Sequence, residues 1–135
     1  MNKFKYIIHR QLWKDFESIY LMESQGRGLI RITREYDNGE SSSIKIWTLS
    51  DLYVEESFRK AGIGAKLLET AINYCKINTL PGSGEITIAT NDHSEAFCDE
   101  WYQRLGFKFD HMETPVSLGE DNEELDWLKI YKLTF

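Results

Sequence analysis

Cysteine is scarce in this chain of 135 residues, and long apolar runs are missing. The two cysteines, Cys75 and Cys98, fall in segments with helical spacing and apolar neighbours, which favours buried, reduced thiols over a disulfide or a metal pair. No apolar run approaches the roughly 20 residues of a membrane span. The apolar stretch at residues 6–8 is shorter than the hydrophobic region of a signal peptide. We therefore expect a soluble, cytoplasmic protein without a membrane partner.

Positive charge is also in short supply. Lys and Arg total 16 against 22 for Asp and Glu, so the formal net charge is −6. Nucleic-acid binding needs an excess of basic groups, which argues against nucleic acid as the main partner. The histidines, His9, His93 and His111, lack the spacing of metal ligands, and no metal site is expected. The length and the 41% hydrophobic content indicate a single globular domain over residues 1–135.

The most informative segment is a glycine-containing junction, Arg59-Lys60-Ala61-Gly62-Ile63-Gly64. Before it, residues 44–54 are rich in β-branched and aromatic side chains, as in a strand. After it, apolar residues recur at the spacing of one helix face: Ile63, Leu67, Leu68, Ala71, Ile72 and Cys75. Glycines let backbone N–H groups approach a ligand, and a helix N-terminus carries free donors and partial positive charge. The junction is therefore predicted to hold a phosphate-bearing ligand.

Hydrophobic periodicity and turn residues predict the order of the elements. Helices are expected at residues 64–78 and 94–105, the second ended by a left-handed Gly106. Strands are expected at residues 3–10, 29–36, 44–54, 85–90, 107–112 and 127–133. Residues 12–22 fit a helix face or a strand, and a short turn followed by a strand is preferred. This order predicts an α/β (α+β) fold, with the two helices packed on a mixed sheet.

These residues resemble the acetyl-CoA-binding core of the GNAT N-acetyltransferase superfamily, over residues 44–135. Arg59, Gly62 and Gly64 match the family's phosphate loop, Q/R-x-x-G-x-G/A, in its place between a strand and a helix. Independently, residues 101–107, Trp-Tyr-Gln-Arg-Leu-Gly-Phe, are similar to the family's aromatic-Tyr-x-x-x-Gly-Phe signature on the later helix. The resemblance implies a mostly antiparallel sheet, acetyl-CoA as co-substrate and an amine as acceptor.

The chain departs from the family pattern at two places. The family commonly has Asn seven residues before the tyrosine and Ala four before it, where this chain has Glu95 and Cys98. Only 43 residues precede the strand expected at residue 44, and they show no convincing pair of helices. Family members usually have two helices there, which shape the acceptor pocket. We therefore expect a reduced N-terminal region, with an acceptor pocket that is more open or is completed by a partner subunit.

The resemblance assigns the acetyl-CoA contacts by position. In the family, the central strand pairs with the pantetheine arm like an added β-strand, and one of its backbone N–H groups faces the thioester carbonyl. That strand segment corresponds to Leu52, Tyr53 and Val54. The pyrophosphate is expected to meet backbone N–H groups of the loop, with two basic side chains nearby. The loop residues concerned are Arg59, Lys60, Ala61, Gly62, Ile63, Gly64 and Ala65.

Acetyl transfer to an amine needs a donor for the oxyanion, a base for the ammonium and an acid for the departing thiolate. Tyr102 is the candidate general acid, because a phenol with a pKa of about 10 holds a proton at neutral pH. Asp51 on the central strand is the candidate base; Glu55, Glu56 and a water chain are the alternatives. The chain shows no Ser-His-Asp order and no nucleophile elbow, which favours direct transfer over an acyl-enzyme.

An acidic segment at residues 119–126 carries five carboxylates. It is either a solvated loop or a negative rim that concentrates a cationic acceptor, such as a polyamine, an aminoglycoside-like amine or a lysine side chain.

A catalytically silent CoA-binding module and an unrelated interaction protein are the competing interpretations of the whole chain. The final strands and the short N-terminal region leave sheet edges that a homodimer would cover.

Overall fold

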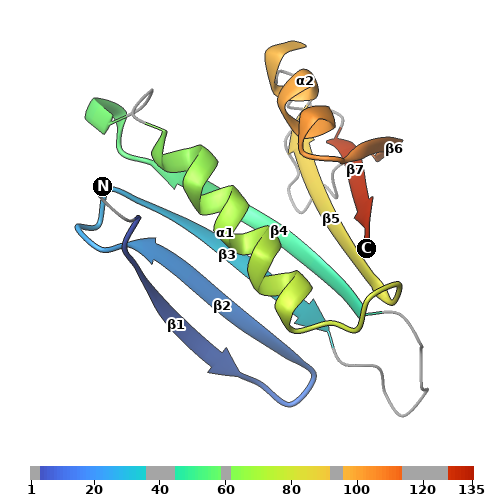
Figure 1. Ribbon diagram of the computed structural model, residues 1–135, viewed down its shortest axis with the longest axis horizontal. Helices are drawn as coiled ribbons and strands as arrows, with labels where there is room; N and C mark the ends of the chain where they lie inside the picture. Colours follow the sequence, from blue (N-terminus) through green and yellow to red (C-terminus); the bar gives the residue numbers. More distant parts are fainter. Residues whose placement is uncertain (1–3, 36–44, 59–61, 92–95, 114–127) are drawn as a thin grey trace, which may run out of the picture.

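The computed structural model describes residues 4–35, 45–58, 62–91, 96–113 and 128–135 (Figure 1). In these ranges, seven strands form a single sheet in the order β1-β2-β3-β4-β5-β7-β6. The strands are β1 (Tyr6–Leu12), β2 (Phe16–Glu23), β3 (Gly28–Glu35), β4 (Lys45–Val54), β5 (Gly84–Asn91), β6 (Lys108–Glu113) and β7 (Leu128–Thr134). The helices are α1 (Ile63–Ile77) and α2 (Ala96–Arg104), and a short 3-10 turn, η1 (Glu56–Phe58), follows β4.

The sheet is mostly antiparallel, as the resemblance implied. Among the described strands, only β4 and β5 run parallel, and α1 lies in the crossover that connects them. The ambiguous residues 12–22 form a turn and then a strand, so that preference is confirmed. The N-terminal strand lies at Tyr6–Leu12 rather than at residues 3–10, because its register with β2 extends to Leu12 opposite Glu17.

The described part of residues 1–44 forms three consecutive antiparallel strands, of which β1 and β2 make a β-hairpin. Trp13 donates its backbone N–H to the carbonyl of Phe16 over 2.8 Å, and this closes the connection between β1 and β2. In the described part of residues 1–44 there is no helix.

The core lies between α1 and the sheet. The buried face of α1 consists of the six residues expected from the periodicity: Ile63, Leu67, Leu68, Ala71, Ile72 and Cys75. They pack against alternating side chains of the central strands, among them Ile19, Ile32 and Leu49. Cys75 is a free thiol whose burial raises its pKa to about 12, so it is buried and reduced as predicted. The side chain of Cys98 lies outside the described residues.

Both helices cover the same face of the sheet (Figure 1). α1 contacts β2 to β5 on the side of Ile32 and Leu49. α2 packs Tyr102 against Tyr131, which stands opposite Ile88 and therefore on the same side. Within the described residues, the opposite face of β2, β3 and β4 carries no helix. We call it the open face. No helix in the described ranges is long and apolar enough to cross a membrane.

Candidate functional site

The two parallel strands separate at one end. β4 and β5 pair from Lys45 opposite Gly84 to Leu49 opposite Ile88, and the register ends there. β4 nevertheless continues to Val54, paired on its other side with β3. Figure 1 shows β4 and β5 diverging toward the end at which α2 lies. Beyond Leu49, no strand of the described residues pairs with the edge of β4 that faces β5. An extended chain can pair with such an edge.

A β-bulge lies in this separated part of β4. Leu29 pairs with Tyr53 and Arg31 with Ser50, so β4 holds one more residue than β3 between the two pairs. Asp51 lies in the bulge with φ of 54°, a left-handed conformation that is uncommon for residues other than glycine. The bulge projects the Asp51 carboxylate, which is 65% exposed, toward Arg31 on the open face. Sequence periodicity predicted the strand and did not predict the bulge.

The start of α1 lies beside the end of β4. Gly62 is the N-cap residue, with φ of 82° and no side-chain capping bond, and a Cβ built on Gly64 would lie 3.5 Å from Cγ2 of Val54. The uncapped backbone N–H groups and the partial positive charge of the helix start therefore lie beside the end of β4, an arrangement that can stabilise a phosphate group. Ile63 is buried in the core and Ala65 is half-buried. Arg59, Lys60 and Ala61 lie outside the described residues.

Gly28, which directly precedes the strand expected at residues 29–36, brings α1 this close to the strands. A Cβ on Gly28 would lie 2.9 Å from the Tyr53 carbonyl oxygen and 3.0 Å from Cδ1 of Leu67. The residue therefore has to be glycine where helix and strand approach. The available signal was a glycine at the start of a strand, which often marks such an approach.

The turn before Gly28 is organised by Glu23, a second residue that the sequence reasoning missed. Its buried carboxylate accepts hydrogen bonds from Nε and Nη2 of Arg27 at 2.9 and 2.8 Å, and from the backbone N–H groups of Gln25 and Arg27. The Arg27 side chain is the largest influence that lowers the pKa of Glu23 to about 2. The Arg27 carbonyl in turn accepts the N–H of Glu55 at 2.8 Å, which anchors the end of β4.

Tyr102 lies on α2 in an aromatic cluster. Its ring centroid is 5.5 Å from that of Trp101 and 5.4 Å from that of Tyr131, and the side chain is half-buried. α2 ends at Arg104, and Gly106 after it is left-handed as predicted, with φ of 100°. Phe107 N–H bonds the Tyr102 carbonyl and Gly106 N–H bonds the Gln103 carbonyl, both over 3.0 Å, which is a Schellman motif. This cap explains physically why a tyrosine is followed four and five residues later by Gly and Phe.

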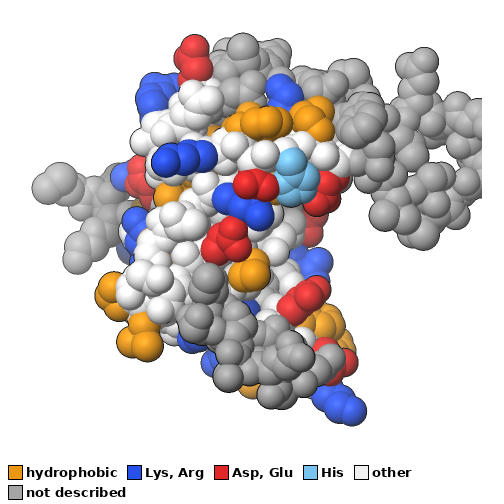
Figure 2. All heavy atoms as spheres, turned by 90° about the vertical axis from the view of Figure 1, so that its right-hand side faces the viewer, with side chains coloured by type: hydrophobic (Ala, Val, Ile, Leu, Met, Phe, Trp, Pro, Cys, Tyr) orange, Lys and Arg blue, Asp and Glu red, His pale blue; other side chains and the backbone are white. Residues whose placement is uncertain are grey.

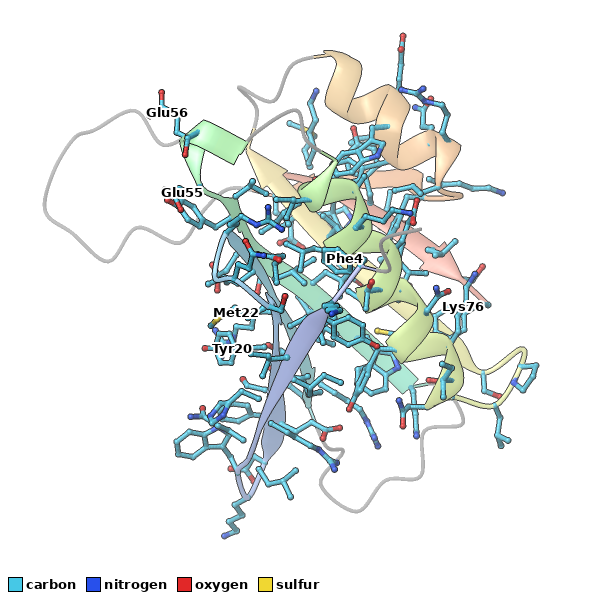
Figure 3. All side chains as sticks on the ribbon, turned by 60° about the vertical axis from the view of Figure 1, so that its left-hand side comes forward. Phe4, Tyr20, Met22, Glu55, Glu56 and Lys76 are labelled. Atoms are coloured by element: carbon cyan, nitrogen blue, oxygen red, sulfur yellow. The ribbon has the colours of Figure 1, made fainter. Side chains whose placement is uncertain are left out.

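The candidate catalytic residues occupy different faces. Asp51 faces Arg31 on the open face, whereas Tyr102 packs on the helix-covered face. Glu55 and Glu56 are exposed at the upper end of β4 (Figure 3). Leu52 and Tyr53 are exposed and Val54 is half-buried, so this segment is open to a ligand. Among the described side chains, no group of three or more His, Cys, Asp or Glu could hold a metal ion.

A family model described as an acetyltransferase (GNAT) domain matches residues 15–109. The chain belongs to the GNAT acetyltransferase family. No protein of curated function matches it in sequence. As a GNAT acetyltransferase it uses acetyl-CoA as co-substrate. The residues present fit that group, because the described strands leave the β5-facing edge of β4 beyond Leu49 for the pantetheine arm, and α1 begins without a side-chain cap where the phosphates would lie.

Solved structures share the fold. Arabidopsis thaliana Naa50, in complex with the bisubstrate analogue CoA-Ac-MVNAL, has a TM-score of 0.67 and 18% identity, covering 87% of this chain and 72% of Naa50. Arabidopsis NAA60 in complex with acetyl-CoA has a TM-score of 0.64 and 14% identity, covering 90% and 77%. The Escherichia coli ribosomal-protein-S18-alanine N-acetyltransferase has a TM-score of 0.61 and 15% identity, covering 91% and 71%. At these identities the similarity establishes the GNAT fold.

Proposed function

We propose that this GNAT protein transfers the acetyl group of acetyl-CoA directly to a primary amine. The observation that carries the proposal is the separation of β4 from β5 beyond Leu49 and Ile88, with the start of α1 beside Val54. In this arrangement the pantetheine arm pairs with Leu52–Val54. The pyrophosphate binds the backbone N–H groups of residues 61–65, with Arg59 and Lys60 adding positive charge.

The amine nitrogen attacks the thioester carbonyl carbon, the C–S bond breaks, and CoA leaves as its thiol. Asp51 accepts the first proton from the acceptor ammonium, directly or through water, and Tyr102 donates the proton that the departing thiolate takes up. The proton that the nitrogen loses from the tetrahedral intermediate returns through water to the Tyr102 phenolate. A backbone N–H of the separated segment stabilises the oxyanion. Cys75 takes no part as an acyl carrier, because it is buried and its pKa is raised to about 12.

Several acceptors carry a primary amine. The Naa50 ligand joins CoA to the acetylated sequence MVNAL, and the E. coli relative is named for an alanine of ribosomal protein S18. A peptide amine, a lysine side chain and a cationic small molecule are therefore all acceptor classes to screen. The acidic segment at residues 119–126 lies outside the described residues. Its negative-rim hypothesis predicts that added salt raises the KM of a cationic acceptor.

The donor site is tested by titrating the protein with acetyl-CoA in a calorimeter, with dephospho-CoA as a comparison ligand. We expect micromolar binding of acetyl-CoA, and Gly62→Asp to abolish it by placing a carboxylate in the phosphate loop. Gly82→Asp is the matched control, because Gly82 has the same φ of 82° and likewise has nothing within 4 Å of a built Cβ. Absence of binding at millimolar acetyl-CoA would refute the donor site.

Turnover is tested by following thiol release with a panel of amines. Tyr102→Phe is expected to lower kcat by about a hundred- to ten-thousand-fold, since a general acid contributes that much, and to leave acetyl-CoA affinity almost unchanged. Tyr6→Phe removes a hydroxyl from an exposed tyrosine on β1 and serves as the control. An unchanged kcat in Tyr102→Phe would remove Tyr102 from the mechanism. Acetyl-CoA binding without turnover on any amine would favour the catalytically silent module.

A further inference from the structure

The open face carries one positive and one negative group beside the bulge in β4. Arg31 on β3 stands opposite Tyr20 on β2 and opposite Ser50 on β4, so its side chain shares the open face with theirs. In Figure 3, Tyr20 and Met22 project from β2 on the side away from α1. Nη1 of Arg31 lies 3.9 Å from Oδ2 of Asp51. The face therefore presents two opposite charges next to the separated part of β4.

The Arg31 guanidinium is held in place by uncharged groups. Its Nε and Nη2 donate to Oγ of Ser18 over 3.3 and 2.9 Å, and its Cζ lies 5.8 Å from the ring centroid of Tyr20. Ser18 is only 1% exposed, so this anchor is rigid, while the Arg31 side chain keeps 32% of its surface exposed. A guanidinium fixed on an aromatic ring with part of its donor fork exposed is suited to binding a carboxylate.

The Asp51 carboxylate does not occupy the N–H donors of the Arg31 guanidinium. The 3.9 Å between Nη1 and Oδ2 exceeds hydrogen-bond length, and the Asp51 side chain is 65% exposed. An exposed ion pair at that distance contributes little stability, so a ligand can take over either partner at small cost. Tyr53 is 53% exposed and stands opposite Leu29 on the same face, beside the bulge.

We propose that the acceptor is a free α-amino acid, with its carboxylate bound by Arg31 and its amino group directed to Asp51. This inference rests on the proposed function, in which Asp51 takes the proton of the acceptor ammonium. An α-amino acid carries an ammonium and a carboxylate on one carbon, which matches a cation and an anion a few ångströms apart. A polyamine would bring an ammonium toward Arg31 without the carboxylate. A peptide N-terminus has an amide in place of the carboxylate, so either acceptor leaves the guanidinium without its counter-charge.

The test compares each common amino acid with its own amide, which keeps the side chain and the amine and removes the negative charge. We expect kcat/KM from thiol release to favour the best free acid over its amide by roughly 10- to 100-fold, the effect of one charge-assisted hydrogen-bonding contact. Arg31→Gln should bring this ratio down toward one. Arg31→Lys, which keeps the charge without the fork, should retain part of it. Lys14→Gln, which removes a charge from the exposed hairpin turn, should retain the full ratio.

The acetyl-CoA affinity of each variant, measured by calorimetry, shows whether its donor site is intact. Amides acetylated as well as acids, or an acid-to-amide ratio that Arg31→Gln leaves unchanged, would overturn the inference and leave the amine acetyltransferase standing. Acetylation of peptides or polyamines but of no free amino acid would also overturn the inference and leave the amine acetyltransferase standing. Failure to bind acetyl-CoA would instead remove the proposed function, and this inference with it.

Discussion

Nε1 of Trp47 donates a hydrogen bond to Oγ1 of Thr79 over 2.9 Å. Trp47 is 1% exposed and Thr79 8%, so neither group has water as a ready substitute. The bond ties the paired part of β4 to the segment that follows α1. The bond therefore lies at the end of β4 that pairs with β5, and the proposed acetyl-CoA site lies at the other end, where the two strands separate.

Thr79→Val should destabilise the fold by about 1–3 kcal/mol, because the buried indole N–H loses its acceptor. The measurement is the free energy of unfolding from urea titration. Thr48→Val on the exposed face of β4 is the control and should change stability by less than about 0.5 kcal/mol. Equal effects of the two substitutions would show that the hydrogen bond of Trp47 makes no measurable contribution to the free energy of unfolding.

Gly64→Ala and Gly62→Ala should separate helix stability from ligand binding. At Gly64 a Cβ makes ordinary contact with Val54 at 3.5 Å, so alanine should stabilise α1 by up to ~1 kcal/mol and keep acetyl-CoA affinity. At Gly62 alanine must adopt φ of 82°, which costs about 1–2 kcal/mol, and affinity should fall as the loop relaxes. Thermal unfolding and calorimetry read out the two effects. A loss of affinity in Gly64→Ala would mean that the ligand approaches this Cα directly.

Glu23 should make stability dependent on acid pH. Its folded-state pKa is lowered from 4.5 to about 2, mainly by hydrogen bonds from Arg27. The stabilisation is therefore fully present above pH 4.5 and is lost as pH falls through about 2. Glu23→Gln should destabilise by about 1–3 kcal/mol at neutral pH and progressively less toward pH 2, measured by urea unfolding at a series of pH values. A difference that stays constant with pH would exclude this linkage.

His111 should make the folding stability depend on pH with a sign opposite to that of Glu23. On the side that carries β6 and β7, charged side chains of both signs gather around a histidine (Figure 2). His111 Nε2 lies 2.7 Å from Glu113 and Nδ1 lies 2.5 Å from Asp110, and these contacts raise its pKa from 6.5. The stabilisation is present below pH 6.5 and is lost as pH rises through the raised pKa. NMR titration should show that pKa, and His111→Gln should remove the trend in stability.

Much of the fold was predictable, because its signals are local. The buried face of α1 follows from the spacing of Ile63 to Cys75, and the end of α2 follows from Gly106. The strand at Phe16–Glu23 was less certain, because its apolar residues fit two periods, and pairing with β1 and β3 decided between them. Asp51, Tyr102 and the loop residues were assigned by motif position, and their catalytic and binding roles stay predictions.

The sequence by itself determined the α/β fold class and predicted a phosphate-binding junction, because periodicity and glycine placement act within a few residues of chain. Only the tertiary structure decided where β4 leaves β5, that β4 bulges at Asp51, and that Arg31 meets Asp51 on the open face. These features depend on the register of strands that are distant in sequence, and on how closely Gly28 lets α1 approach them. No local pattern encodes that register, because it is fixed by the packing of the whole sheet against α1.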